Sequence, residues 1–139
     1  MVFRKLENGF ILKLEKGEEI IATLSDFAQK EKIDGGFVYG IGTANNLTLG
    51  YYNADKKDYL KKAFQGDFEI VSLMGNISLL KGSPVAHIHM VISDSNFNCS
   101  AGHLFSGTIA ATGEFVIHTT KSRMERVFDP QTSLNLLKL

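Results

Sequence analysis

Two histidines separated by one residue, His87 and His89, are the residues of this sequence best placed for chemistry. They lie in an apolar and β-branched stretch, Pro84-Val-Ala-His-Ile-His-Met-Val-Ile92, that is typical of a strand. Residues two apart in a strand point to the same face, with their Cα atoms about 7 Å apart. Two neutral imidazoles in this arrangement can reach one ion, so we expect this stretch to contribute to a metal site.

A third histidine, His103, lies on the next expected strand. The link between the two strands, Asp94-Ser-Asn-Phe-Asn98, is rich in turn-forming residues and predicts a β-hairpin. His89 and His103 each lie seven residues from Asn96, so they face each other if Asn96 is the centre of the turn. Opposed residues in an antiparallel pair share a face. A register shifted by two residues would pair His103 with His87 and would also keep the three histidines together.

Three neutral imidazoles with an open coordination position are typical of catalytic zinc sites. We therefore predict that His87, His89 and His103 bind a divalent ion, with zinc favoured because imidazole ligands suit it. The alternative is that each histidine separately lines a polar groove or bonds to a backbone carbonyl. Cys99, the only cysteine, lies four residues, or about 13 Å, along the strand from His103. We expect it to be a small buried apolar residue rather than a fourth ligand.

A second group of candidate residues lies on the strand-like stretch from Glu114 to His118. Alternation places both side chains on one face. Glu114 is a candidate catalytic residue, because beside the histidine strands it could orient a ligand or accept a proton from bound water. The alternative is a solvent-facing glutamate at the start of a strand. We expect His118 to lie at the surface or in a subunit contact.

The remaining pattern predicts one helix and many short strands. Residues 18–32 carry apolar side chains at helical spacing, and Asp34-Gly35-Gly36 is expected to end the helix. Strands are predicted at 10–14, 37–39, 47–51, 68–73, 75–80, 85–93, 100–111 and 115–120. Residues 55–64 predict a short amphipathic helix or a loop, and the leucine-rich tail, 129–139, is expected to pack on this subunit or its neighbour. This order predicts an α/β fold of the α+β kind, with a curved, mostly antiparallel sheet.

Length and charge limit the function classes. A chain of 139 residues predicts a single domain, residues 1–139. Lys and Arg number 15, as do Asp and Glu, and this neutral balance disfavours DNA as a partner. Near the tail, Lys121, Arg123 and Arg126 alternate with Glu125, which predicts a solvated face. No apolar run is long enough to span a membrane or act as a signal peptide, so we expect a cytoplasmic protein without a membrane partner.

The order of these motifs resembles the plant and prokaryote conserved (PPC) domain. The matching pieces cover nearly the whole chain: the helix after Gly17-Glu18, Gly40-Ile-Gly42, Gly75-Asn-Ile-Ser78, Pro84-Val-Ala-His-Ile-His89, Gly102-His-Leu104, Glu114-Phe-Val116 and the tail from Arg126 to Leu139. The resemblance implies an α/β fold with a curved antiparallel sheet, a homotrimer, and a zinc site at the three histidines of prokaryotic members. Plant members typically lack these histidines and contact DNA through AT-hook segments, whereas this chain has no Arg-Gly-Arg-Pro core.

These observations favour a metal-binding protein that binds or transforms a small molecule at the three histidines. A DNA-binding or transcription-associated trimer is the alternative, and a scaffold with a purely structural metal is a third. A pocket beside the histidines would favour the first function. A continuous basic patch across subunits would favour the second, and a closed site with four protein ligands would favour the third.

Overall fold

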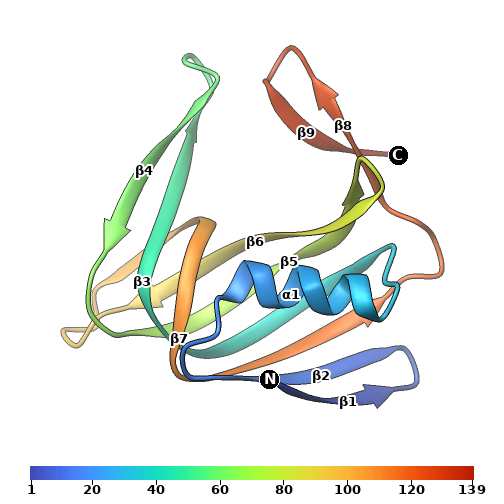
Figure 1. Cartoon of the computed structure of the whole chain (residues 1–139). Coiled ribbons are helices and arrows are strands. Elements are labelled where there is room, and N and C mark those ends of the chain that lie inside the picture. Colours follow the sequence, from blue (N-terminus) through green and yellow to red (C-terminus); the bar gives the residue numbers. More distant parts are fainter.

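The computed structural model describes all residues, 1–139, as nine strands and one helix (Figure 1). In chain order the elements are β1 (Val2–Leu6), β2 (Gly9–Glu15), α1 (Ile20–Lys30), β3 (Gly36–Asn53), β4 (Asp58–Phe64), β5 (Phe68–Leu80), β6 (Ser83–Ser93), β7 (Cys99–Thr119), β8 (Glu125–Asp129) and β9 (Leu134–Lys138). The predicted α+β class, with one helix and a strand-rich remainder, is confirmed.

All nine strands belong to one strongly curved sheet. Every pairing is antiparallel except the short parallel contact between β5 and β8. The long strand β3 pairs with β4, β5 and β7 along different parts of its length, and β6 pairs with both β5 and β7. Strands β3, β5, β6 and β7 therefore form a closed ring of pairings, which confirms the predicted curvature and mostly antiparallel order.

Several strands that the sequence predicts as separate are continuous. The predicted pairs 37–39 with 47–51, 68–73 with 75–80, and 100–111 with 115–120 correspond to β3, β5 and β7. Glycine in a strand can mark a bulge or allow another backbone to approach closely. A Cβ at Gly75 would lie 2.0 Å from the His87 carbonyl oxygen of β6, so only glycine allows β5 to pass this close. At Gly42, where φ is 150°, β3 has a register shift of the kind a β-bulge makes.

Residues 55–64 were predicted as a short helix or a loop, and this prediction is wrong. Strand β4 pairs with β3 from Leu47 to Asn53, in a long hairpin that extends beyond the body of the sheet (Figure 1). Tertiary pairing decides the conformation here, because β3 supplies a complete ladder of backbone partners. Strand β1, which the sequence did not reveal, is an exposed edge strand that pairs with β2.

The helix α1 lies within the predicted range and packs on the inner face of the sheet, against β6 and β7 (Figure 1). Its N-cap is Glu19, whose carboxylate accepts a hydrogen bond from the Ala22 N–H at 2.6 Å. It ends before the predicted glycines, because Lys32 takes the left-handed conformation, with φ at 55°. Its buried side chains are Ile20, Leu24, Phe27 and Ala28. They share one core with the inward-facing residues of β6, which are Ile88, Met90 and Ile92.

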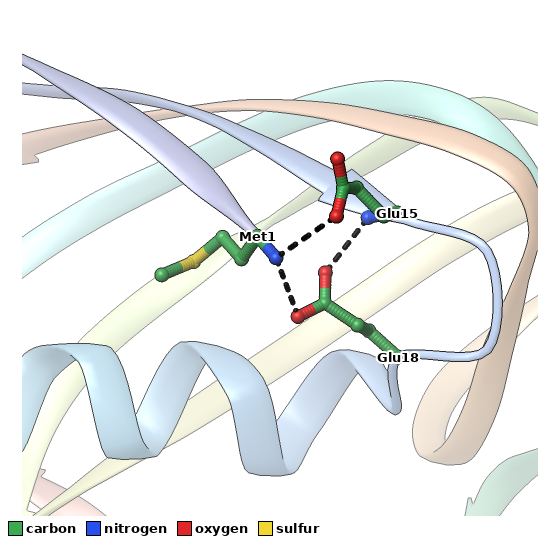
Figure 2. A network of polar contacts seen from close by, with 3 residues as sticks. All are labelled: Met1, Glu15 and Glu18. Atoms are coloured by element: carbon green, nitrogen blue, oxygen red, sulfur yellow. Dashed lines mark hydrogen bonds and ion pairs between the residues drawn. The ribbon is translucent and has the colours of Figure 1, made fainter.

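The N-terminus is fixed by a network of opposite charges (Figure 2). The Met1 amine donates to Glu18 Oε1 at 2.8 Å and lies 3.6 Å from Glu15 Oε2. The second oxygen of Glu18 accepts a hydrogen bond from the Glu15 backbone N–H at 2.7 Å. This network joins the start of β1 to the segment that leads into α1.

Candidate metal site

The hairpin of β6 and β7 places the three histidines together. His89 lies directly opposite His103, which is the register predicted from the sequence. The turn between the strands is held by Asp94, whose Oδ1 accepts hydrogen bonds from the N–H groups of Asn96 and Asn98, each at 2.9 Å. His87 lies two residues before His89 on the same face of β6, opposite Asn76 of β5.

One ligating nitrogen from each of the three histidines lies within 4.8 Å of the other two. The ring centroids are 5.0 to 5.3 Å apart. His87 and His103 are half-buried, whereas His89 is exposed. The arrangement therefore has a protected inner side and an open outer side, and no acidic or cysteine side chain belongs to the cluster.

Burial keeps these imidazoles neutral. Burial, followed by the charge of Arg126 and by the other two histidines, lowers the pKa of His87 to about 4. The pKa of His103 is also about 4, chiefly because of burial and then because of His89 and Arg126. Burial lowers the pKa of His89 as well. Neutral imidazole is the form that binds metal, so the cluster is in its ligating form at pH 7.

The surroundings of His103 also fit a metal ion. Its Nδ1 is buried and makes no hydrogen bond. A buried polar atom without a partner costs about 1–3 kcal/mol of stability. Coordination of a metal ion by this nitrogen would remove that cost. Tyr59 and Phe105 pack on the ring, with centroids 5.1 and 4.8 Å from it, and so restrict its orientation. The donor set and the orphaned nitrogen are both consistent with a divalent ion.

Arg126 is a functional candidate that sequence reasoning missed. The alternating charges of this segment predicted a solvated face, but Arg126 is half-buried beside His87. Its Nη2 lies 2.8 Å from His87 Nδ1 and 2.8 Å from Asn76 Oδ1, and its Nε donates to Ser78 Oγ at 2.7 Å. The reason is tertiary: β8 pairs in parallel with the end of β5, and this contact turns Arg126 toward the histidines.

A cavity of about 250 Å³ adjoins the cluster. His87, His103 and Arg126 are among the residues that line it, and most of the other lining residues are apolar, among them Leu80, Val85 and Leu134. The leucine-rich tail therefore packs on its own subunit, where β9 pairs with β8 and contributes Leu134 to this cavity. A larger cavity of about 400 Å³ lies near Lys5 and Asp34 and contains none of the histidines.

The other sequence candidates lie elsewhere. Glu114 is exposed in the part of β7 that pairs with Lys13 and Ile41, eleven residues beyond His103, so the structure does not bring it to the cluster. His118 is exposed, as expected for a surface residue. The prediction that Cys99 is buried is wrong, because it lies exposed at the start of β7 after the hairpin turn.

The single helix has 11 residues, which is too short to cross a bilayer.

A curved, mostly antiparallel sheet with one helix and a three-histidine cluster defines a recognisable class of protein. The family model of the Plants and Prokaryotes Conserved (PCC) domain matches residues 1–121, and the chain belongs to this family. The resemblance noted from the sequence is thereby confirmed. No curated protein matches the chain.

Solved structures share the fold over nearly the whole chain. A candidate DNA-binding protein from Bacteroides thetaiotaomicron is 32% identical, with a TM-score of 0.94, and the alignment covers 99% of this chain and 96% of that one. A plant- and prokaryote-conserved protein from Pyrococcus horikoshii is 29% identical, with a TM-score of 0.89 and coverage of 99% and 95%. A metal-containing protein from Archaeoglobus fulgidus is 33% identical, with a TM-score of 0.88 and coverage of 100% and 99%.

Proposed function

We propose that this protein binds one divalent metal ion per subunit through His87, His89 and His103, and that the metal serves to bind a small molecule in the adjoining cavity. Zinc is the favoured ion, since imidazole nitrogens suit it and the site has no thiolate. The observation that carries the proposal is the meeting of three neutral imidazoles, with ligating nitrogens within 4.8 Å, beside a cavity of about 250 Å³. The metal-containing relative from Archaeoglobus fulgidus adds support.

The ligating nitrogens lie within 4.8 Å of one another. With Zn–N distances of about 2.0–2.1 Å, nitrogens in tetrahedral positions lie roughly 3.4 Å apart, so side-chain rotation would bring the three nitrogens to the spacing that zinc requires. Three protein ligands leave a coordination position for water or a ligand. A zinc ion bound there would polarise a carbonyl or lower the pKa of bound water to about 7. His87 and His103 would face the cavity, and exposed His89 would form the outer side of the site.

Elemental analysis of purified, untagged protein tests this proposal. We expect one zinc per chain, removed by a strong chelator and restored by adding zinc. If the chelated protein also unfolds, the metal is structural and the scaffold function replaces the binding function. A protein that contains no metal after purification and takes up none on titration contradicts the proposal.

We further propose that the protein is a homotrimer. Large apolar side chains are exposed on the sheet face opposite α1: Phe37, Tyr39 and Ile41 of β3, with Val71 and Met74 of β5. Tyr39 pairs with Met74, and Met74 pairs with His89, so this apolar row reaches the edge of the metal site. Such a contiguous face is typical of a subunit interface. Light scattering is expected to give three times the chain mass of 15.4 kDa, and Tyr39→Glu is expected to reduce it.

DNA binding is the second candidate, because one relative is named a candidate DNA-binding protein. The equal numbers of basic and acidic residues argue against it. A few phosphate contacts would give dissociation constants of about 10⁻⁴ to 10⁻⁶ M at physiological salt. A gel-shift titration that gives nanomolar, sequence-specific binding would favour DNA over the small molecule.

A further inference from the structure

Arg126 is a half-buried cation without an anionic partner. Each of its hydrogen-bonding contacts is to a neutral group: Ser78 Oγ, Asn76 Oδ1, His87 Nδ1 and the Asn135 carbonyl oxygen, the last at 2.8 Å from Nη1. No carboxylate lies within 4.0 Å of its guanidinium, although the neighbouring Arg123 pairs with Glu125 at 3.1 Å. A partly desolvated charge is costly unless it is paired. The guanidinium therefore lacks the anion that would normally offset its burial.

The contact with His87 has a consequence for metal binding. A guanidinium has only N–H donors, so Nδ1 of neutral His87 must accept the hydrogen bond, and its proton then resides on Nε2. A metal ion needs a free lone pair on one of these two nitrogens. Coordination through Nδ1 displaces Arg126 directly, and coordination through Nε2 moves the proton to Nδ1, where it opposes the Arg126 donor. Binding of a metal by His87 thus frees an N–H group of Arg126.

The freed group has a cavity beside it. Arg126, His87 and His103 all line the 250 Å³ cavity. A divalent ion at the histidines and the guanidinium of Arg126 would repel each other across this space. An anion between the two cations relieves that repulsion and supplies the charge that Arg126 lacks. The remaining walls, including Leu80, Val85 and Leu134, suit an apolar group rather than further charge.

We propose that the cavity binds a small monocarboxylate with a short apolar group, its carboxylate lying between the bound metal and Arg126. This proposal rests on the proposed metal site for its full form, although Arg126 and the cavity exist without the metal. A planar carboxylate matches the planar fork of N–H donors on arginine. A tetrahedral dianion would leave an additional charge against apolar walls, so the cavity favours a carboxylate over a sulfate- or phosphate-like ligand.

Isothermal titration of zinc into untagged, metal-free protein tests the proposal. Benzoate is the probe, benzamide is its neutral isostere, and sulfate represents an anion without an apolar group. We expect saturating benzoate to tighten zinc binding at least about tenfold, while benzamide has no effect and sulfate has a smaller effect than benzoate. An equal effect of benzamide overturns the role of charge, and an equal effect of sulfate overturns the choice of a carboxylate with an apolar group.

Two variants locate the effect. Arg126→Met should still bind zinc, within about threefold of the wild type or tighter, but should lose the benzoate effect, whereas the exposed control Arg123→Met should retain both. Because Arg126 also holds β9 through Asn135, Leu134→Trp is a second test that fills the cavity and spares the arginine. It should retain zinc binding and lose the benzoate effect. A benzoate effect that is unchanged in both variants overturns the proposal.

Failure of the metal site is distinguishable from failure of the carboxylate site. If the wild type binds no zinc, the proposed function fails, and benzoate is then titrated into metal-free protein while the Arg126 Nε–H resonance is followed by NMR. A saturable shift that is absent from Leu134→Trp supports the carboxylate site. The absence of any shift in the wild type overturns it.

Discussion

The molecule contains two polar networks that differ in whether their charged groups have partners of opposite charge. Near the N-terminus, the Met1 amine has two carboxylates, from Glu15 and Glu18, within 4.0 Å (Figure 2). Beside the histidine hairpin, Arg126 has four neutral partners and no carboxylate. The first network is complete within the chain, since its charges have partners of opposite sign. The second contains one unbalanced cation and three neutral imidazoles.

This difference separates a structural network from a site. A complete ion pair near the surface adds modestly to stability and needs nothing else. The guanidinium of Arg126 lies beside neutral imidazoles and has no partner of opposite charge in the chain. Only a bound anion would balance its charge. The depressed pKa values of His87 and His103, both about 4, describe the same condition, because they show that the folded protein disfavours further positive charge there.

Removal of a ligand should have the largest effect. His89→Ala is expected to weaken zinc binding by more than about 100-fold, since loss of even a supporting partner of a metal ligand commonly costs 10- to 100-fold. The domain should stay folded, because His89 is exposed and lies outside the apolar core. Zinc titration and circular dichroism of the same preparation measure the two effects.

His118→Ala and Cys99→Ser are the matched controls for that variant. His118 is also an exposed histidine, but it lies at the far end of β7, and Cys99 lies four residues before His103 on the same strand. Both should keep one zinc per chain. Full zinc content in His89→Ala, or its loss in either control, would show that the metal lies elsewhere.

The histidine cluster was predictable from sequence because it depends only on contacts between residues close together in the chain. His87 and His89 follow from strand alternation, and His103 follows from the symmetry of a short turn about Asn96, so the register needed no tertiary information. The apolar face of β6 was predictable for the same reason. Arg126 was not, because its position depends on the pairing of β8 with β5, two segments separated by about 45 residues of chain.

The strand limits show a similar contrast. Glycines such as Gly75 can end a strand or allow close packing, and sequence alone does not distinguish the two. Here the neighbouring strand β6 decides, since its backbone occupies the space of the missing side chain. Strand β4 likewise depends on the partner that β3 offers, so its charged sequence was misinterpreted as a helix or a loop.

The next effect concerns pH and zinc. An unperturbed histidine, with a pKa near 6.5, would lose zinc as the pH falls below about 6. Since His87 and His103 have pKa values of about 4 in the folded protein, protons should compete with zinc only at lower pH. We expect zinc affinity to change by less than about tenfold between pH 7 and pH 6 and to fall most steeply closer to pH 4. A tenfold loss already at pH 6 would contradict this environment for the histidines.

A smaller effect concerns the stability of the metal-free protein. The folded pKa values of His87 and His103 lie below the unfolded value of about 6.5, so the unfolded chain binds more protons between about pH 6.5 and pH 4. The free energy of unfolding should therefore decrease as the pH falls through this window. Urea titrations with chelator present should show this decrease in the wild type, and a weaker one in the double variant His87→Gln, His103→Gln. Equal pH dependence in the two proteins would exclude these histidines as the cause.

The smallest effect should come from the complete network. Burial raises the pKa of Glu18, but its hydrogen bonds with the Met1 amine and the Glu15 N–H outweigh this and lower the pKa overall. The carboxylate therefore contributes stability above its unfolded pKa of about 4.3, and this is lost as the pH falls through the lower folded value. Glu18→Gln should reduce the free energy of unfolding at pH 7 by about 1 kcal/mol or less, as measured by urea titration.

Glu15→Gln should reduce the free energy of unfolding by less, because the Glu15 carboxylate oxygen lies farther from the Met1 amine, at 3.6 Å. Both variants should bind zinc as tightly as the wild type, because both carboxylates face the Met1 amine and lie outside the histidine cluster. A change in zinc affinity for either one would show that the two networks are coupled and that the separation drawn between them is wrong.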